Sequence, residues 1–182
     1  MIRRMRQTLK RFTGDRRGVS AVEFALLAPL MITLYVGCAE VSDAVSADRK
    51  VSLTAAAVAN LAAQVTTISS TDMTNILAAA SAIIAPYSTS QLTITLSCIN
   101  IDANKNATVK WSVTSGGTAR SGTITLPTAL AVASTQLLLG EATYQYKPTV
   151  GYTITGTLNL SDRMYMSPRI TAPVYNNTAC AS

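Results

Sequence analysis

The first apolar block of the chain runs from Phe24 to Ala39 and contains no charged residue. With the four residues before Glu23, and with Glu23 accepted inside the segment, the block reaches about 20 positions, the length that a helix needs to cross a bilayer core. Pro29 lies inside it, where it kinks a membrane helix rather than excluding one. The pattern predicts a transmembrane helix over residues 19–41.

The helical pattern continues beyond this block. Residues 41–66 contain neither proline nor glycine, and apolar residues recur in them at helical spacing: Val41, Ala44, Val45, Val51, Ala55, Val58, Leu61, Ala62 and Val65. We expect one long helix whose outer half lies on a globular head. Ser69 to Asp72 supply N-cap chemistry for a second helix over Asp72–Ala85, which Pro86 ends. Residues 42–88 are therefore predicted to form a helical segment outside the membrane.

From residue 89 the spacing of apolar residues changes from helical to alternating. Over Gln91–Asp102, apolar residues alternate with Thr and Ser, as in a half-buried strand: Leu92, Ile94, Leu96 and Cys98. Ala107–Thr114 repeats the alternation after a turn at residues 104–106: Val109, Trp111 and Val113. Further strands are expected at Gln136–Tyr146 and Gly151–Leu160. Helices followed by antiparallel strands indicate an α+β fold, with residues 89–182 as a β-rich head.

Charge is concentrated at the N-terminus. Residues 1–18 hold seven basic groups and one acid, Asp15, which accounts for the whole net charge of +6. A nucleic-acid-binding domain spreads its Lys and Arg over a folded face, so this distribution argues against nucleic acid as a partner. A basic tail before an apolar helix is instead held on the cytoplasmic side of a membrane. The sequence predicts a basic cytoplasmic leader over residues 1–18 and a periplasmic head.

The chain has three cysteines, of which Cys38 lies inside the apolar block. Cys98 and Cys180 lie far downstream, in the part that this orientation places in an oxidising compartment. We expect a disulfide between them, with two free buried thiols as the alternative. On the chain-entropy model, a bridge closing so long a loop stabilises a fold by roughly 4–5 kcal/mol.

The stretch around Gly18 resembles a prepilin processing site. Two arginines precede Gly18, four small or apolar residues follow it, and Glu23 and Phe24 come next, before the apolar helix. The resemblance implies that a prepilin peptidase cuts between Gly18 and Val19, which makes Glu23 the fifth residue of the mature chain. Glycine fits an extended scissile bond without side-chain interference. A glutamate at the membrane edge is costly unless paired, and in pilins it meets the new N-terminal amine of a neighbouring subunit.

The C-terminal part narrows the resemblance to TadE-like proteins. Their closing strands combine a Tyr-x-Tyr-x-Pro strand with a Tyr-Met-x-Pro-Arg ending, and the matching residues here are Tyr144, Tyr146, Pro148, Tyr165, Met166, Pro168 and Arg169. The alanine-rich segment 55–87 also resembles the family. Phe24 stands where the major pilins of the tight-adherence system have Tyr, which favours a minor pseudopilin. TadF-like and TadG-like branches stay open.

The TadE-like resemblance implies a pilin-like head and an assembly role. The expected protein is a single-pass protein of the bacterial inner membrane that assists a tight-adherence pilus, or a related type II/IV secretion-like machine, in assembly, adhesion and surface colonisation. Its expected partners are the prepilin peptidase, other pseudopilins, pilus assembly proteins and the lipid bilayer. The resemblance leaves open whether the chain stays in the membrane or enters an extracellular pilus.

Several kinds of catalytic or ligand site have no basis in the sequence. The chain has no histidine, which removes Ser-His-Asp triads and histidine metal sites, and it has no C-x-x-C spacing. Asp102, Asn104 and Asn106 lack the glycine and glutamate of a calcium loop and are interpreted as a solvated turn. Tyr144, Tyr146, Tyr152 and Tyr165 are interpreted as packing residues. We expect no enzyme, no metal and no cofactor.

Three other interpretations remain as alternatives. Tyr35 to Cys38 approximate a lipid-attachment box, in which Cys38 would be acylated and everything before it removed. The chain could also be an uncut, signal-anchored periplasmic domain with a binding role, or a protein secreted after a cut behind Ala39. Neither of the latter has a positive sequence feature beyond the apolar block.

Overall fold

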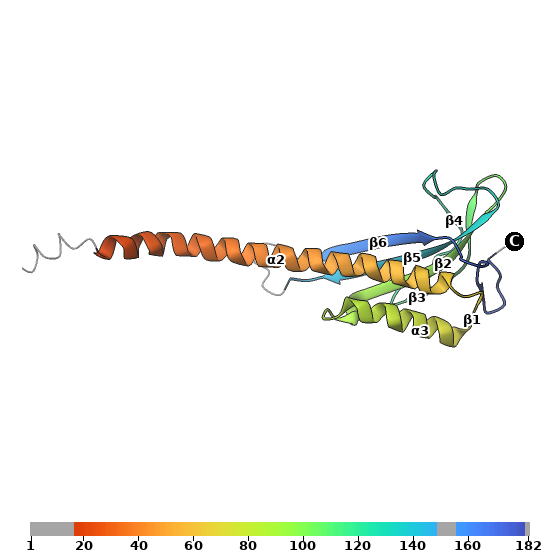
Figure 1. The fold of residues 1–182 in the computed structure, drawn as a ribbon, viewed down its shortest axis with the longest axis horizontal. Helices are drawn as coiled ribbons and strands as arrows, with labels where there is room; N and C mark the ends of the chain where they lie inside the picture. The colour runs from red at the N-terminus through yellow and green to blue at the C-terminus, as the bar shows by residue number, and fades with distance from the viewer. Residues whose placement is uncertain (1–16, 149–155, 181–182) are drawn as a thin grey trace, which may run out of the picture.

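The computed structural model describes residues 17–148 and 156–180 (Figure 1). Its longest element is α2 (Arg17–Ala63), a single helix of 47 residues that contains Pro29. The hydroxyl of Thr33 donates to the carbonyl oxygen of Pro29 at 2.8 Å, the i to i−4 bond that a threonine makes within a helix. The long helix that the sequence predicts is confirmed. Most of the predicted leader, residues 1–16, lies outside the described residues.

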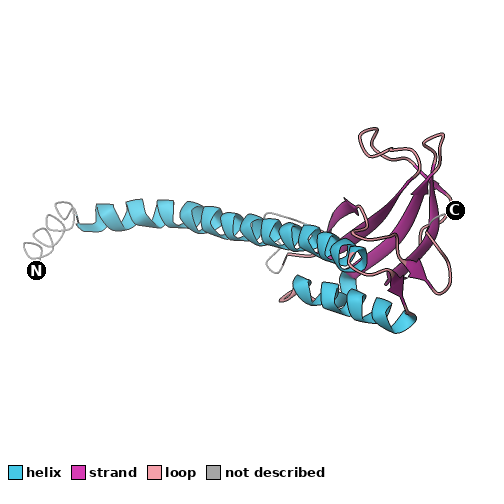
Figure 2. Ribbon diagram, turned by 45° about the vertical axis from the view of Figure 1, so that its right-hand side comes forward, coloured by secondary structure: helices cyan, strands magenta, loops and turns pink. Residues whose placement is uncertain are grey.

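The two halves of α2 have different surroundings. The first half projects away from the rest of the molecule, and the second half lies along a sheet (Figures 1 and 2). Apolar side chains of the first half are exposed, with Phe24 at 69% and Tyr35 at 77%. In the second half, Ala47, Val51 and Ala55 are fully buried. Among the described residues, α2 is the one helix long and apolar enough to cross a membrane, which makes it a candidate membrane anchor.

The head is built on a five-stranded antiparallel sheet of order β4-β3-β2-β5-β6. Its strands are β2 (Leu92–Ile101), β3 (Ala107–Ser115), β4 (Thr123–Ile124), β5 (Thr135–Tyr146) and β6 (Leu158–Met166). The second half of α2 covers one face over β5 and β6, and α3 (Ser70–Ser81) lies beside it (Figure 1). Short elements complete the head: η1 (Ala82–Ile84), η2 (Thr89–Gln91), and the parallel pair β1 (Thr67–Ile68) and β7 (Val174–Tyr175). The fold is α+β, as predicted.

The central strand β2 is buried on both faces, where the sequence predicts a half-buried strand. On the α2 side, Leu96 and Ile94 belong to the main core. On the opposite side, Ile99 and Ile101 form a second cluster with Leu137, Leu139 and side chains of the β4–β5 connection. Because the chain between β3 and β5 folds back over that outer face, residues that alternation assigns to solvent are covered.

The hydroxyl-bearing residues on the outer face of β2 are satisfied by pairing with β3. The Thr95 hydroxyl lies 3.0 Å from that of Thr114, and the Ser97 hydroxyl lies 2.8 Å from that of Ser112. Such pairs let a buried polar group keep a partner. Alternating Ser and Thr residues can therefore be buried under a covering loop. The prediction that these residues of β2 face solvent is wrong.

A β-bulge in β3 changes which face its side chains take. The register shifts so that Cys98 lies opposite Trp111 and Ile99 lies opposite Val109, which leaves Lys110 without a counterpart. Trp111 packs in the main core, and Val109 packs in the second cluster on the other face. Strict alternation would put both side chains on one face. The extra residue is what separates them.

Three predicted boundaries need correction. The second helix is predicted to end at Ala85, but α3 ends at Ser81 and the 3₁₀ turn η1 (Ala82–Ile84) follows it. The second helix begins at Ser70 rather than Asp72 because Ser69 is its N-cap: the Ser69 hydroxyl accepts from the Asp72 N–H at 3.1 Å, and the Asp72 carboxylate accepts from the Ser69 N–H at 3.0 Å. The predicted strand Gly151–Leu160 partly lies outside the described residues, and β6 runs from Leu158 to Met166. Gly156 has φ +96°, so the extended conformation begins after it.

Candidate functional site

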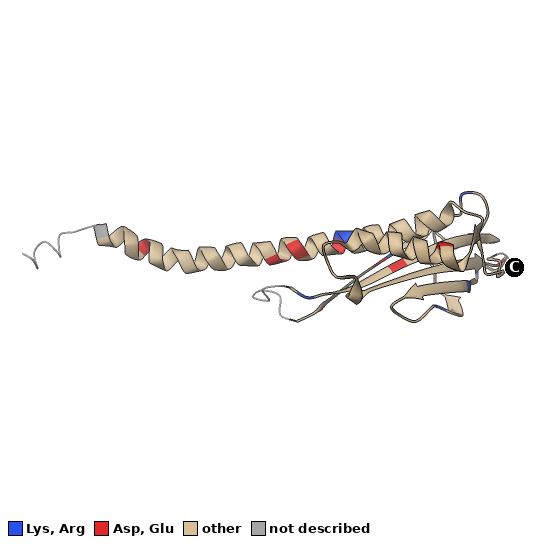
Figure 3. Cartoon of the chain, turned by 90° about the horizontal axis from the view of Figure 1, so that it is seen from below, with Lys and Arg blue, Asp and Glu red and all other residues tan. Residues whose placement is uncertain are grey.

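The residues of the proposed processing site lie at the start of α2. Gly18 is on the helix surface, and a Cβ built on it would meet nothing within 4 Å. Val19 and Phe24 are 54% and 69% exposed, and Glu23 is also exposed. Beyond Glu23 the helix carries no charge until Glu40, and Figure 3 shows this length of α2 in tan without blue or red. The arrangement places one acid at the outer end of a long apolar surface.

Val19 and Glu23 are four residues apart in the same helix. Residues at this spacing are neighbours on one face, so a positive charge at position 19 would lie beside the Glu23 carboxylate. A chain that began at Val19 would carry its amine there. Glu23 could then pair with its own N-terminus or with that of an adjacent helix, since both lie at the helix surface.

A cluster of three tyrosines and one aspartate holds α2 to the head just beyond the apolar block. Asp43 on α2 accepts hydrogen bonds from the Tyr87 hydroxyl at 2.7 Å and the Tyr146 hydroxyl at 2.6 Å. The Tyr87 ring lies 6.1 Å from the rings of both Tyr144 and Tyr146. We call Asp43, Tyr87, Tyr144 and Tyr146 the tyrosine clasp. It joins α2, the loop after η1 and strand β5.

The tyrosine clasp perturbs the ionisation of its hydroxyls. Desolvation, followed by the hydrogen bond to Asp43, raises the pKa of Tyr87 to about 12. The same two causes raise the pKa of Tyr146, and desolvation raises that of Tyr144. All three groups stay neutral at physiological pH and act as hydrogen-bond donors or packing surface. Tyr144 and Tyr146 therefore have the packing role predicted for them, whereas Tyr152 lies outside the described residues.

Sequence reasoning missed Asp43 and Tyr87. A signal existed for Asp43, because an acid three residues beyond Glu40 on a helix surface must find solvent or a donor. Nothing local pointed to Tyr87, which follows the Ala85–Pro86 peptide and reaches Asp43 only through the packing of η1 against α2. Glu40, which the sequence marks as the end of the apolar block, is buried.

The predicted disulfide is present. Cys98 on β2 is bonded to Cys180 with a Cα–Cα distance of 5.8 Å, and both residues are fully buried. Cys38 is free and exposed on the apolar half of α2. The bridge ties the C-terminal segment to the centre of the sheet.

The C-terminal segment is also fixed to the end of α2. The backbone N–H of Arg169 donates to the carbonyl oxygen of Ala63 at 3.0 Å, and its guanidinium donates to the Asn60 side chain at 2.8 Å. A cation at a helix C-terminus is favourable because the last carbonyls carry partial negative charge. Near it, the Trp111 indole N–H donates to the carbonyl of Pro173 at 3.2 Å. The arginine of the expected Tyr-Met-x-Pro-Arg ending thus serves as a helix cap.

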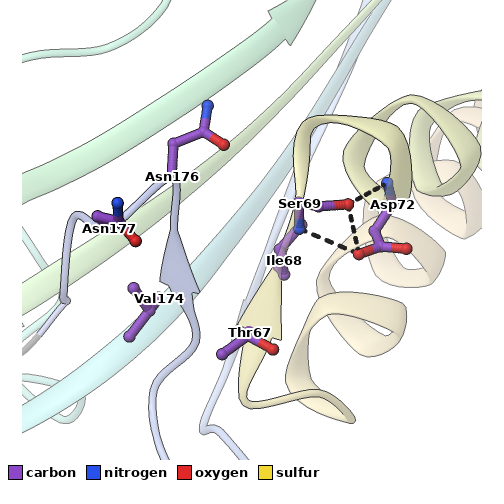
Figure 4. Close-up of a pocket in the computed structure, with 7 residues that line it drawn as sticks. All are labelled: Thr67, Ile68, Ser69, Asp72, Val174, Asn176 and Asn177. Carbon is purple, nitrogen blue, oxygen red and sulfur yellow. Dashed lines mark hydrogen bonds between the residues drawn. The ribbon is translucent and has the colours of Figure 1, made fainter.

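A pocket of about 420 Å³ lies between the start of α3 and the β1–β7 pair (Figure 4). Seven residues line it: Thr67, Ile68, Ser69, Asp72, Val174, Asn176 and Asn177. Hydrogen bonds from Ser69 lower the pKa of Asp72, and the Ser70 hydroxyl lies 3.1 Å from the Asn176 side-chain oxygen. Asn176 and Asn177 have φ of 44° and 62° in a tight turn. These polar groups hold the helix start and the turn, and we assign the pocket no chemistry.

On the outer face of the sheet, Arg120 forms a bidentate ion pair with Glu141 on β5. The hydrogen bonds that the Arg120 guanidinium donates to Glu141 raise the pKa of Arg120. The backbone N–H of Arg120 also donates to the Ser112 hydroxyl at 3.1 Å. The pair fastens the β3–β4 connection over the sheet. In the part of the chain that the structure describes, no cluster of three or more His, Cys, Asp or Glu side chains could hold a metal ion.

Part of the chain is similar to a known protein family. Residues 18–60 match the family model described as TadE-like protein. No match was found among curated proteins or among solved structures. The recognition drawn from the sequence is confirmed over the matched residues, which lie within α2 and include Gly18, Glu23 and Asp43. The C-terminal resemblance, which lies outside this range, stays a prediction.

Proposed function

From the TadE-like character of its N-terminal helix, we propose that this chain is a minor pseudopilin of a tight-adherence pilus or of a related type II/IV secretion-like machine. It sits in the bacterial inner membrane with its N-terminus in the cytoplasm and its head in the periplasm. Its role is structural and not enzymatic. The observation that carries the proposal is a processing motif at the start of one unbroken helix whose first half is exposed and apolar.

The exposed apolar half of α2 requires an apolar environment. Phe24, Leu26 and Tyr35 are each at least 69% exposed, and no part of the described head covers this half. In lipid, the helix satisfies its own backbone hydrogen bonds, so it can span the bilayer. In a bundle of similar helices, the same surface is buried against neighbours, and the chain can leave the lipid without exposing it to water. A pilin helix is in the bilayer before assembly and in a helix bundle after it.

Cleavage between Gly18 and Val19 is proposed to precede assembly. The site lies at the helix end that joins the basic leader, which the positive-inside rule keeps in the cytoplasm. A prepilin peptidase is therefore the expected first partner. After the cut, the Val19 amine is one helical turn from Glu23, and the acid gains a partner that offsets the cost of a charge at the membrane edge. Pairing with a neighbouring subunit would set the register of assembly.

The head is proposed to serve assembly, adhesion and surface colonisation through contacts with other pseudopilins and pilus assembly proteins. The head is attached to α2 over a long contact, because small and apolar side chains of the helix pack on the sheet. The tyrosine clasp and Arg169 also bind the helix at two separate positions, Asp43 and Asn60. A force on the helix is thus transmitted to the head. This suits a subunit that is lifted or packed as one body.

The test of the proposed function is the N-terminus of the mature protein, read by mass spectrometry from membranes with and without the prepilin peptidase. We expect a start at Val19 that needs the peptidase. Gly18→Arg should block maturation and pilus assembly, because a long charged side chain replaces the one residue without a Cβ at the cut. Glu23→Ala is the matched variant, expected to be cut normally and to assemble poorly.

A mature protein that starts at another residue would support one of the alternative functions. A start at acylated Cys38 would make the chain a lipoprotein, and uncut Met1 or a start at Glu40 would make it a signal-anchored or secreted domain. Normal pilus formation by Gly18→Arg would also contradict the proposal. Full assembly of Glu23→Ala would remove only the pairing role of the glutamate.

A further inference from the structure

We propose that heads of neighbouring copies join edge to edge, with strand β6 of one copy added to the free part of strand β3 of the next. The proposal goes beyond helix-mediated assembly and rests only on one part of the proposed function, namely that α2 holds all copies in the same membrane. It arises from an open edge, a groove beside the opposite edge, and the direction of the strands.

Strand β6 is a long edge strand whose charged residues are confined to the adjacent pair Asp162 and Arg163. It forms nine consecutive pairs with β5 without a register shift, and it contains no proline, glycine or lysine. Soluble proteins normally shorten, bulge or charge such an edge because its unpaired backbone groups invite another strand. Leu158 and Met164 are 37% and 38% exposed on the face that carries α2. The edge is thus regular, long and partly apolar.

The opposite edge is covered only in its outer part. Strand β4 pairs with Ala107 and Thr108, and the Val109 N–H donates to the Gly122 carbonyl at 2.9 Å. From Lys110 to Ser115, β2 is the one strand that pairs with β3 among the described residues. Beside this free part lies a groove of about 510 Å³ between β3 and α3, whose apolar lining includes Met73, Leu77 and Val113.

The strand directions match the pairing. Strands β3 and β5 both run antiparallel to β2, and β6 runs antiparallel to β5, so β3 and β6 point in opposite directions. Copies held by α2 in one membrane all point the same way. Placing two such heads side by side therefore brings β6 of one antiparallel to β3 of the other, which is the more favourable pairing.

When two heads lie side by side at the same level above the membrane, the rows of directly opposed residues in the two sheets also line up. Met164, Gly140, Leu96 and Val113 lie on one row of directly opposed residues, as do Met166, Leu138, Cys98 and Trp111. A lateral neighbour thus sets Met164 against Val113 at the groove and Met166 against Trp111. A flexible methionine suits an irregular apolar groove.

Polar residues meet polar residues on the other face. Arg163 shares a row with Thr114, and Tyr165 shares one with Ser112. Directly opposed residues in an antiparallel pair lie on the same face, so both faces match in chemistry. Because the two surfaces differ, the contact is head-to-tail and continues from copy to copy as a ring or a row. The occupant of the β3 edge is therefore a second copy of this chain.

The experiment is cysteine crosslinking of the full chain in its native membrane, in a Cys38→Ser background. Asp162→Cys and Ser115→Cys lie on the same row at the two edges. The double variant should give a ladder of dimers and higher oligomers under mild oxidation, and each single variant alone should stay monomeric. Co-expression of the two single variants should give dimers only. The matched control, Asp162→Cys with Lys105→Cys in the distant β2–β3 turn, should give no ladder.

Met164→Lys in the double-cysteine chain should abolish the ladder while the Cys98–Cys180 bond remains, because a charge enters the apolar groove. Monomers from a double variant with that disulfide intact would overturn the proposal, as would dimers of Asp162→Cys alone. If the first pair fails to fold, Arg163→Cys with Thr114→Cys tests the next row. If the chain is not cut at Gly18 and still gives a ladder, the proposed function is overturned and the edge pairing stands. If the chain is cut at Gly18 and gives no ladder, the edge pairing is overturned and the proposed function stands.

Discussion

Gly140 is the point at which α2 comes closest to the sheet. A Cβ built at this position would lie 2.4 Å from the carbonyl oxygen of Ala55 and 2.8 Å from a methyl of Val58. Real Cβ atoms do not approach backbone oxygen so closely, so a side chain at position 140 must push the helix away. The glycine is needed for space and not for an unusual backbone conformation.

Gly140→Ala should lower the free energy of unfolding of the full chain in detergent by about 1–3 kcal/mol, the usual cost of overpacking a core. Urea titration followed by the fluorescence of Trp111, the single tryptophan, measures it. Gly117→Ala is the comparison variant: its nearest contact is a side-chain methyl of Thr93 at 2.8 Å and not backbone, so a smaller effect than at Gly140 is expected. Equal effects of the two substitutions would show that helix–sheet spacing does not depend on Gly140.

The role of Gly140 could not be predicted from its neighbours in the sequence. The alternation over Gln136–Tyr146 predicts a strand, and β5 (Thr135–Tyr146) confirms it. The crowding at Gly140 comes from Ala55 and Val58, which are more than 80 positions away in the chain. Only the crossing of helix and strand brings them together.

At the scale of elements, the tyrosine clasp joins a helix, a loop and a strand that local sequence does not relate. Asp43 has two hydroxyl donors, Tyr87 from the loop after η1 and Tyr146 from strand β5. Losing the Asp43 carboxylate takes its acceptor from the Tyr146 hydroxyl, whereas the Tyr87 hydroxyl can still donate to the Asp43 main-chain carbonyl oxygen at 3.1 Å. The clasp therefore holds the head to α2 at the end nearest the apolar block.

The clasp predicts a stability that falls at high pH. Tyr87 has its pKa raised from 10.0 to about 12 in the folded chain, so the folded state favours the neutral hydroxyl. Its contribution is fully present below pH 10 and is lost as the pH rises towards 12. Urea midpoints measured between pH 9 and 12 should fall for the native chain and fall less steeply for Tyr87→Phe.

The matched control for this pH dependence is Tyr175→Phe, a tyrosine beside Trp111 at a site away from the clasp. Its midpoint should follow the native curve. If Tyr87→Phe loses stability with pH as steeply as the native chain does, the Tyr87 hydroxyl does not titrate in the way proposed.

At the scale of the whole molecule, the Cys98–Cys180 bond closes a long part of the chain onto its central strand. The two residues are separated by 82 positions, and between them lie β3 to β7. A crosslink of this span restricts the unfolded chain strongly. It also holds the C-terminal segment whose carbonyl at Pro173 receives the Trp111 indole hydrogen bond.

Replacing both residues by serine should lower the free energy of unfolding by roughly 4–5 kcal/mol on the chain-entropy model. Trp111 fluorescence under urea, in oxidising buffer, measures the change, and reduction of the native chain with dithiothreitol should reproduce it. Cys38→Ser is the control, since Cys38 is exposed on the apolar half of α2. An unchanged midpoint for the double variant would contradict the stabilising role.

The sequence alone determined the elements that depend on composition and local spacing. The long helix, the capped second helix and the antiparallel strands follow from periodicities that span a few residues. The Gly18–Phe24 motif and the basic leader are likewise contiguous, so the anchor and the TadE-like recognition needed no coordinates. The pairing of Cys98 with Cys180 followed from the cysteine count and the expected compartment.

The tertiary structure decided everything that depends on which distant segments meet. It placed the β3–β5 connection over the outer face and so buried the hydroxyls of β2, which the pattern assigned to solvent. It inserted Lys110 as a bulge and turned Val109 away from Trp111. It brought Tyr87 to Asp43 and Arg169 to the end of α2. These contacts are long-range, and the free energy that selects them comes from burying surfaces against each other, which no local pattern encodes.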